Sequence, residues 1–532
     1  MMDIDEQEYQ TSAAPSTSSR GLPTIVPADD AHPFDLESYI SNYTGRTAID
    51  RLIHIVSLCP QLAVEAYNLA VQRIQKSRDP SIYQNLCNAY DQISSHPDVV
   101  NVYKIKLPSL AELPALNSKW VEETVKKNHL EKMKLEAELK NYSNNMIKES
   151  IRLGHRDLAE FCRATGDYSS ALKHWTKSRE FCSTSQHVLD GCLSTLELLI
   201  EQKNYSHIPT YVFKADAALE AATAAANSNN DPKNPSTATA SAASSASKKT
   251  SVLTGDRELV QSKLDFATAL SQLAQGSYER AAYHFLRIAP GTPSSGTGGG
   301  LGDWFGKVVS PGDIAIYGTV CALASLSRSG FKAQVIENLN FSVYIEQESY
   351  VREMIEAYMG SNFKGVLESL SRYNTRHTLD PHLYTHLPSL LNLTRTRLVT
   401  LYFAPFSTIK LDRMSTAFGW SMADTEDFVV DLVRKGEIIG RVDSREKVLR
   451  VRRGGKSGKA VSSKNGAGIS GERKEIWRDV VRRGVEMGSL NRKLVYRMKL
   501  QQADLIIKPP KGSGGGNLAP NQGSMAGEFL VE

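Results

Sequence analysis

The segment from Phe406 to Arg453 decides the fold of the C-terminal part, and it reads FSTIKLDRMSTAFGWSMADTEDFVVDLVRKGEIIGRVDSREKVLRVRR. Its first part, FSTIKLD, predicts a short extended piece that leads into Asp412, a residue type that caps helices at their start. The following RMSTAFGW predicts one short helix, which Gly419 ends. Pro405 breaks the helical run that comes before this segment.

A second helix and a hairpin follow in the same segment. ADTEDFVVDLVRKGEI carries apolar residues at helical spacing, so we expect a helix with Phe428, Leu432 and Val433 facing inward. IIGRVDSREKVLRVRR alternates apolar and polar residues around Asp443 and Ser444, which predicts a β-hairpin. Two short helices followed by a hairpin are the order of a winged helix.

The charges of this winged helix favour a protein over a nucleic acid as its partner. To read DNA, the second helix should offer Arg, Lys, Asn or Gln to base edges, but its acidic residues outnumber its basic ones. The acidic residues are Asp424, Glu426, Asp427, Asp431 and Glu437. We expect the hairpin to offer an edge strand to another chain. The predicted interaction residues are Ile438, Ile439, Arg441, Val442, Val448 and Leu449.

Four short segments share one pattern: a small or polar pair, an aromatic residue, and an apolar residue three positions later. They are GDYSSAL (166–172), KNYSHI (203–208), GSYERAA (276–282) and SNFKGVL (361–367). An apolar helical stretch precedes each of them, which is typical of antiparallel helix pairs of the tetratricopeptide type. We expect these pairs to stack into a solenoid, with the aromatic residues filling the gaps between them. A non-repeating helical bundle is the alternative.

Further helices are expected outside these repeats. From Trp120 to Cys162 the acids and lysines alternate and apolar residues are sparse at first, which predicts one long, partly solvated helix. SPGDIAIYGTVCALASLSR predicts a helix that opens at Asp313, with Ser310 or Asp313 as its cap.

The expected fold is mostly α, a TPR-like helical-repeat solenoid followed by a winged-helix subdomain and a long C-terminal helix. Stretches rich in Ser, Ala, Gly or Pro separate the ordered parts. The expected segments are a disordered tail at 1–32, an N-terminal helical-repeat domain at 33–217, a low-complexity insertion at 218–250, a helical domain at 251–403 with a Gly-rich loop at 289–302, the winged helix at 404–453, a flexible loop at 454–471, a bundle helix at 472–507 and a disordered tail at 508–532.

Composition excludes several classes of protein. The 532 residues carry a net charge of only +5, which gives no whole-chain electrostatic case for nucleic acid. The six cysteines form no C-x-x-C motif, and free thiols in a reducing compartment are the simple interpretation. The N-terminus does not resemble a signal peptide, and the most apolar stretch, 314–326, is too short to span a bilayer. We expect a protein of the cytoplasm and nucleus without a membrane partner.

No catalytic, cofactor or metal site is expected. No H-x-H zinc motif occurs, and Leu383 stands between His382 and His386 where a zincin carries Glu, so these two are interpreted as surface or core histidines. RRGGKSGK (452–459) is not a phosphate-binding loop, because Arg450 stands five residues before the glycine of its Gly-Lys-Ser, where such a loop needs Gly. GTGGGLG lacks the dinucleotide-binding spacing, and no G-x-S-x-G elbow is present.

A helical-repeat solenoid that ends in a winged helix resembles the PCI-domain family, which the proteasome lid, the COP-nine signalosome and eukaryotic initiation factor three share. Several stretches resemble the signalosome branch of that family. They are DLESYISNYTGRTAIDRLIHI, SPGDIAIYGTVCALASLSR, LDRMSTAFG, GEIIGRVDSREKVLRVRR and LIIKPP. The segments 218–250, 289–302 and 454–471 depart from the compact family pattern.

The resemblance also implies a mode of assembly. PCI winged helices are implied to line up edge to edge, and the C-terminal helices are implied to gather in a bundle. The candidate bundle-facing residues are Ile476, Val480, Leu490, Leu494 and Leu505. Packing of the same apolar stripe against the chain's own domain is the alternative.

The resemblance implies a non-catalytic scaffold subunit of the signalosome, a complex that removes the ubiquitin-like modifier Nedd from cullin–RING ligases in the ubiquitin pathway. The implied partners are other PCI-domain subunits, MPN-domain subunits, one of which carries the catalytic zinc, and neddylated cullin–RING ligases reached through the complex. A PCI subunit of the proteasome regulatory lid is one alternative. A winged-helix regulator that binds nucleic acid is the other, although nucleic acid is not the expected partner.

Overall fold

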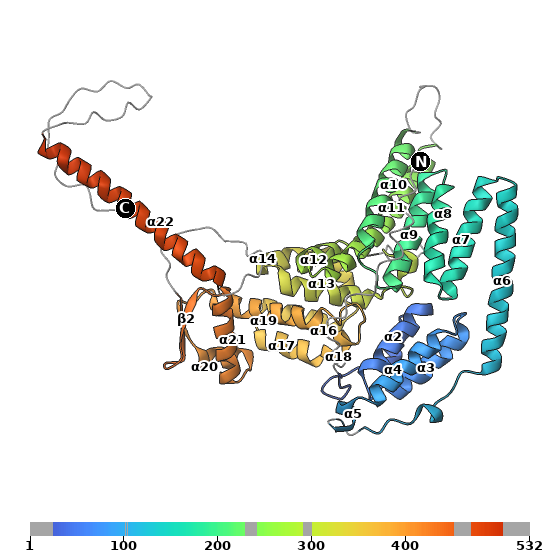
Figure 1. Cartoon of the computed structure of the whole chain (residues 1–532), viewed down its shortest axis with the longest axis horizontal. Coiled ribbons are helices and arrows are strands. Elements are labelled where there is room, and N and C mark those ends of the chain that lie inside the picture. Colours follow the sequence, from blue (N-terminus) through green and yellow to red (C-terminus); the bar gives the residue numbers. More distant parts are fainter. Residues whose placement is uncertain are drawn as a thin grey trace. The chain divides into compact units, whose positions relative to one another are not determined.

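The computed structural model of the chain describes residues 25–101, 103, 105–228, 242–290, 300–451 and 470–503. The chain divides into two compact units, residues 1–452 and 453–532. The first unit is a mostly helical array that ends in a winged helix, and the second contains one long helix (Figure 1). The expected fold class, a mostly α helical-repeat solenoid with a winged helix and a long C-terminal helix, is confirmed.

The described chain begins at residue 25, before the expected end of the tail at residue 32, and its first helix begins at Leu36. Val26 is buried, and its amide donates to the Leu58 carbonyl at 3.0 Å. The Thr375 hydroxyl donates to the Pro27 carbonyl at 2.7 Å. Hydrogen bonds to Leu58 and to Thr375 therefore hold this start of the described chain in place. The elements here are α1 (Leu36–Ser41), α2 (Gly45–Leu58), α3 (Ala63–Lys76), α4 (Ile82–Ser94), α5 (Pro97–Asn101) and the 3-10 helix η2 (Leu110–Glu112).

The prediction of a single long helix between Trp120 and Cys162 is wrong, because the structure has two helices there. Helix α6 (Ser118–Asn144) stops at an Asn-rich run, Met146 adopts a positive φ of 55°, and α7 (Lys148–Ala164) follows. The two helices contact each other, and Gly154 of α7 lets Leu139 of α6 approach closely. The alternation of acids and lysines hides this break, because it continues on both sides of it.

All four repeat segments form turns between contacting helices, as expected. The first residue of each turn is left-handed, with φ of 85° at Gly166, 58° at Lys203, 74° at Gly276 and 60° at Ser361. The next amide then donates to a carbonyl five residues earlier, which closes the preceding helix. The helix pairs are α7 with α8 (Tyr168–Glu180), α9 (Ser185–Glu201) with α10 (Ile208–Ser228), α11 (Ala242–Ala274) with α12 (Tyr278–Leu286), and α16 (Ser349–Met359) with α17 (Phe363–Arg372).

The aromatic residue of each repeat segment contacts a side chain that is distant in sequence. These contacts tie the repeats to neighbouring elements, as the expected gap-filling role requires. The pairs are Tyr168 with Arg46, Tyr205 with His382, Tyr278 with His386 and Phe363 with Phe418.

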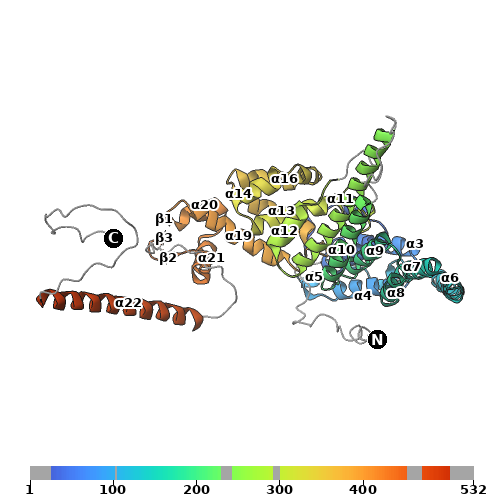
Figure 2. The ribbon, with the colours of Figure 1, turned by 90° about the horizontal axis from the view of Figure 1, so that it is seen from above.

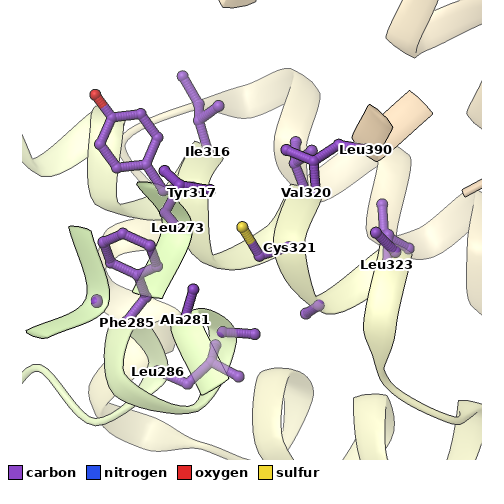
Figure 3. Close-up of a cluster of buried hydrophobic side chains, with 14 of the residues drawn as sticks. Leu273, Ala281, Phe285, Leu286, Ile316, Tyr317, Val320, Cys321, Leu323 and Leu390 are labelled. Atoms are coloured by element: carbon purple, nitrogen blue, oxygen red, sulfur yellow. The ribbon is translucent and has the colours of Figure 1, made fainter. Parts of the chain in front are cut away.

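Helix α13 (Pro311–Ser325) lies at the centre of the largest hydrophobic cluster. Figure 3 shows side chains of α11, α12 and α19 around it, among them Leu273, Phe285 and Leu390. A Cβ on Gly318 would lie 2.7 Å from the Phe341 ring, so glycine permits this close approach. Ser310 caps the helix in a capping box with Asp313, which confirms the expected cap. The neighbouring elements are η4 (Gly302–Trp304), α14 (Arg328–Phe331), the π-helix η5 (Lys332–Ile336), α15 (Leu339–Ile345), α18 (Asn374–Thr378) and α19 (Leu387–Phe403).

Helices occupy the ends of the segment expected as an insertion at 218–250. Helix α10 continues to Ser228 and α11 begins at Ala242, with Ala218 and Leu219 buried. The Ala-rich start of this segment therefore belongs to α10. Residues 229–241, and residues 291–299 of the Gly-rich loop, lie outside the described residues.

The winged helix follows the expected order. Helix α20 (Leu411–Phe418) ends at Gly419, which has φ of 70°, and α21 (Met422–Lys435) packs Phe428, Leu432 and Val433 against the core. The expected cap at Asp412 is wrong, because α20 begins one residue earlier, with Lys410 in the capping position. FSTIKLD contributes a third strand to the hairpin. The strands are β1 (Thr408–Lys410), β2 (Gly440–Asp443) and β3 (Val448–Val451).

Aromatic rings join the winged helix to the helices before it. The Phe418 ring stacks on Phe363 of α17 and on Trp420, with ring centroids 5.9 and 5.0 Å apart. Tyr402 of α19 meets Phe418 edge to face at 5.4 Å. One hydrophobic cluster runs from Leu189 to Leu449, so the core itself does not divide at 217, 251 or 403.

The second unit contains helix α22 (Ser470–Gln502), shown in red in Figures 1 and 2. Of the loop expected at 454–471, residues 454–469 lie outside the described residues and residues 470 and 471 belong to α22. The tail expected at 508–532 also lies outside the described residues. In the part of the chain that the structure describes, no helix combines the length and apolar character needed to cross a membrane.

Candidate functional site

The sheet of the winged helix has a strand that can pair with another chain. Its order is β1-β3-β2, and both outer strands run antiparallel to β3. Strand β2 pairs with β3 along one side only, and no described strand covers its other side. An uncovered strand presents main-chain donors and acceptors to a partner strand.

The six predicted interaction residues differ in how far they are exposed. Ile438, Val448 and Leu449 are buried in the chain's own core, so their side chains hold the winged helix together. Val442 is half-buried and lies opposite Leu449 in the sheet register. Ile439 is 70% exposed and Arg441 is exposed, so these two are the side chains that a partner at the β2 edge could contact.

Ion pairs within the domain neutralise part of the basic wing. Lys447 donates to Glu426 of α21, and this hydrogen bond lowers the pKa of the Glu426 carboxyl. Arg450 donates to Glu446 at 2.6 Å. The Asp443 carboxylate accepts from two backbone amides of the turn, which fixes the shape of the wing. These pairs reduce the positive field that a nucleic-acid backbone would need.

Helix α22 presents a stripe of exposed apolar side chains. Leu490 and Leu494 are 60% and 58% exposed, and Met487 and Met498 continue the same helical face. Ile476 and Val480 lie in α22 at positions where the structure does not describe side chains, and Leu505 lies outside the described residues. A large exposed apolar stripe on a charged helix is typical of a surface that another helix covers.

A buried network of charges joins the N-terminal helices to the middle of the chain, and the sequence analysis did not predict it. Arg51 of α2 donates to Asp380 at 2.7 Å and to Asp313 of α13 at 3.1 Å. Arg376 donates to the other oxygen of Asp313 at 2.9 Å. Tyr317 donates to Asp380 at 2.7 Å. This charge joint, as we call the network around these five residues, fixes α2 against α13 and the segment after α18.

Burial and pairing set the charge states within the charge joint. Burial would raise the pKa of Asp380, but the Arg51 charge outweighs it and holds this pKa below its usual value. Burial raises the pKa of Tyr39 to about 12, so its phenol remains neutral beside Arg51. Burial also lowers the pKa of His377 to about 3 and that of His382 to about 4, so both imidazoles are neutral at pH 7.

The signal for the charge joint was present in the sequence. Tyr39, Tyr43 and Arg51 lie in the stretch DLESYISNYTGRTAIDRLIHI, and Asp313 and Tyr317 lie in SPGDIAIYGTVCALASLSR. Both stretches carried the family resemblance. A charged or phenolic residue on an apolar helix face is such a signal, because it needs a buried partner.

The two histidines considered as possible metal ligands are packed against tyrosines. The Nδ1 atom of His382 lies 2.5 Å from the Tyr205 hydroxyl, and the His386 ring meets the Tyr278 ring at 6.2 Å. Both side chains are partly buried. Among the described residues, no group of three or more His, Cys, Asp or Glu side chains could hold a metal ion.

Comparison with protein families matches two parts of the chain. A family described as the 26S proteasome subunit RPN7 matches residues 117–334, from α6 to η5. The PCI domain family matches residues 370–453, which contain α19 and the winged helix.

Curated relatives match most of the chain. The COP9 signalosome complex subunit 1 of Arabidopsis thaliana is 30% identical over 84% of this chain and 87% of that protein. Subunit 1b of Drosophila melanogaster is 28% identical over 78% of both chains. Subunit 1 of Emericella nidulans is 29% identical over 82% of this chain and 78% of its own length. With this identity across nearly the whole length, and with its helical repeats leading into a PCI winged helix, the chain belongs to the COP9 signalosome subunit 1 family.

Proposed function

We propose that this chain is a non-catalytic scaffold subunit of a COP9 signalosome. The observation that carries the proposal is the similarity to signalosome subunit 1 proteins over more than three quarters of the chain. The architecture supports it as well, because a stiff array of helices with an uncovered strand and an exposed helical stripe suits the holding of other proteins.

Other PCI-domain and MPN-domain subunits are the proposed partners. A neighbouring PCI winged helix would add a strand to the β2 edge, where its side chains meet Ile439 and Arg441. Ile439 supports this assignment, because so large an apolar side chain lies 70% exposed beside an uncovered strand. Main-chain hydrogen bonds would supply affinity, and the exposed side chains would select the partner.

Helix α22 is proposed to join the C-terminal helices of other subunits in a bundle. Leu490 and Leu494 would face the bundle, with Met487 and Met498 on the same stripe. Ile476, Val480 and Leu505 are proposed to extend this stripe in both directions. Each apolar side chain that a partner helix covers would add about 1.5–3 kcal/mol of burial.

We assign the chemistry to the complex rather than to this chain. The complex would remove Nedd from cullin–RING ligases with a zinc site in an MPN-domain subunit, and this chain would position that subunit and help to engage the neddylated cullin. The complex is proposed to work in the cytoplasm and the nucleus, which fluorescence microscopy of the tagged chain would test.

Affinity purification of the tagged chain from its native cells tests the proposal. We expect the eluate to contain an MPN metalloprotease and other PCI subunits, and to cleave neddylated cullin in a reaction that a zinc chelator stops. Recovery of neither the subunits nor the cleavage activity would contradict the proposal.

The proteasome lid remains a second candidate because residues 117–334 match a family described by a 26S proteasome subunit. In that case the same purification would recover lid subunits without cullin cleavage. A nucleic-acid regulator is the third candidate and would rest on the exposed arginines of the wing. It requires DNA binding that weakens steeply with salt, and we expect none.

A further inference from the structure

Two hollows that share lining residues lie on helices α7 to α10, far in sequence from the winged helix. The first hollow has a volume of about 150 Å³ and lies between α7, α8 and α9, with Trp175 in its wall. The second is an open hollow of about 360 Å³ beside α10. Arg179 and Val188 line both hollows, so we treat them as one feature, the repeat groove. The helices that form it lie side by side in both Figure 1 and Figure 2.

The half of the repeat groove beside α10 is apolar. Val188, Ala217 and Ala218 line it together with Phe213. Phe213 is 76% exposed, although a phenylalanine ring gains about 1.5–3 kcal/mol when it is buried. An exposed aromatic ring at the edge of an apolar hollow is typical of a surface that receives an apolar side chain.

Two cations of the groove have no anionic partner among the described residues: Arg179, which lines both halves, and Lys214, which lines the apolar half. No described residue forms a hydrogen bond or ion pair with the Arg179 guanidinium, and the Lys214 ammonium only lies over the Tyr211 ring at 5.1 Å. The other cations of the groove are paired: Arg152 contacts Glu149 at 2.5 Å, and Arg156 contacts Glu160 at 3.5 Å. The free positive charge is therefore concentrated at Arg179 and Lys214, next to the apolar half.

The polar half contains a hydrogen-bond donor without an acceptor. The Trp175 side chain is buried, and its indole N–H has no partner among the described residues. Buried polar groups in native proteins normally find a partner, and a bound ligand is one of the ways in which they do. This donor and Arg179 line the same hollow, and both favour an acceptor-rich ligand.

We infer that the repeat groove binds an acidic peptide segment of a partner protein, with one large apolar side chain seated beside Phe213. Carboxylates on either side of that side chain pair with Arg179 and Lys214, and a further acceptor enters the polar half. Glu160 and Asp190 also line the polar half and would repel a continuous phosphate backbone. Separated carboxylates on a peptide can avoid these two acids, which favours a peptide over a nucleic acid.

A peptide-display selection on the full-length chain tests this inference. Random dodecapeptides are selected on the wild type, and those that also bind the double variant Arg179→Glu, Phe213→Ser are removed. We expect the remaining peptides to be rich in Asp and Glu around one Leu, Phe or Trp. Each single variant should weaken the best peptide at least tenfold, and added salt should weaken its binding to the wild type.

Matched variants keep the result interpretable. Lys177→Glu changes the same charge on the same helix, but Lys177 is exposed outside the groove, so this variant should bind as the wild type does. The Arg179 and Phe213 side chains are exposed, so the temperature of thermal unfolding should be the same in these variants as in the wild type. Lys214→Glu tests the second unpaired cation of the groove in the same way. Survival of no peptide after this removal, or survivors that bind each single variant as tightly as the wild type, would overturn the inference. So would groove-dependent peptides that are neutral or basic, or displacement of the acidic peptides by RNA at equal charge concentration.

Discussion

Two joints within the first unit hold its parts together by different physics. The charge joint fixes the N-terminal helices with Arg51, Arg376, Asp313 and Asp380, all in the interior. The aromatic joint fixes the winged helix with stacked and edge-to-face rings around Phe418. A buried ion pair demands one geometry, because a displaced charge is left without compensation. Packed rings lose contact area gradually and carry no charge penalty.

This difference matters for a scaffold. In the charge joint, Arg51 of α2 donates to two carboxylates at once, Asp313 of α13 and Asp380, whereas the aromatic joint supports the winged helix through apolar area. We therefore expect the removal of one charged partner to cost the charge joint much of its stability, and we expect that stability to depend on pH. The stability of the aromatic joint should depend only on the volume of its packed rings.

Replacing Arg51 with Met should have the largest effect. Met fills similar space but leaves Asp313 and Asp380 short of a buried partner, so the variant should lose about 3–5 kcal/mol of stability. Hydrogen exchange followed by mass spectrometry should show opening of α1 and α2 before the winged helix opens. The control is Arg352→Met, which removes an exposed pair with Glu356 and should change nothing measurable. Equal effects of the two variants would contradict the charge joint.

Replacing Phe418 with Ala should come next, with a loss of about 3 kcal/mol from the cavity that it leaves. Exchange should rise in α20 and α21 and stay unchanged in α1 and α2. Phe406→Ala serves as the control, because that ring is 40% exposed. If the stability lost in Phe418→Ala differed between pH 7 and pH 5, the aromatic joint would not be purely apolar.

Acid should weaken the charge joint selectively. Burial lowers the pKa of His382 from 6.5 to about 4, so the folded chain keeps this imidazole neutral while the unfolded chain protonates it first. Stability contributed by the neutral form is therefore complete above pH 6.5 and declines as the pH falls toward 4. Exchange of α1 and α2, corrected for the intrinsic rate at each pH, should rise across this window. If the ratio of the exchange rate of α1 and α2 to that of α20 stayed constant across this window, the prediction would be wrong.

The repeat turns should give the smallest effects, of opposite sign. Ser361 adopts a left-handed φ of 60° beside Phe363 of the aromatic joint, so Ser361→Gly should stabilise the chain by about 1 kcal/mol. Gly276 has φ of 74° and open space around its Cα, so Gly276→Ala should destabilise it by about 1 kcal/mol. Urea midpoints of the two variants should shift in opposite directions, and shifts of the same sign would contradict the shared turn geometry.

The two joints also differ in how far the sequence predicts them. The winged helix was predictable because its apolar residues follow local periodicity, and its aromatic residues sit where that periodicity places a core. The repeat turns were predictable for the same reason, since the left-handed residue and the aromatic residue lie two positions apart. Both predictions rest on the spacing of residues that are close in sequence.

The charge joint could not be predicted from local spacing, because Arg51 and Asp380 are 329 residues apart. The break after α6 was hidden by a continuous charge pattern, and the sequence pattern did not distinguish buried Leu449 from exposed Ile439. Leu449 on the middle strand β3 belongs to the hydrophobic cluster, whereas Ile439 precedes β2 and is exposed, so tertiary packing decides between them. Contacts between separate elements decide these features, and local spacing does not show such contacts.

The most direct test of the scaffold role is a comparison of complexes purified with wild-type chain and with the variant Ile439→Asp, Arg441→Glu. Both side chains are exposed, so the isolated variant should unfold at the wild-type temperature. We predict that it recovers less than a tenth of the PCI partners, as measured by quantitative mass spectrometry. Full recovery of the same partners by the folded variant would contradict assembly through the β2 edge.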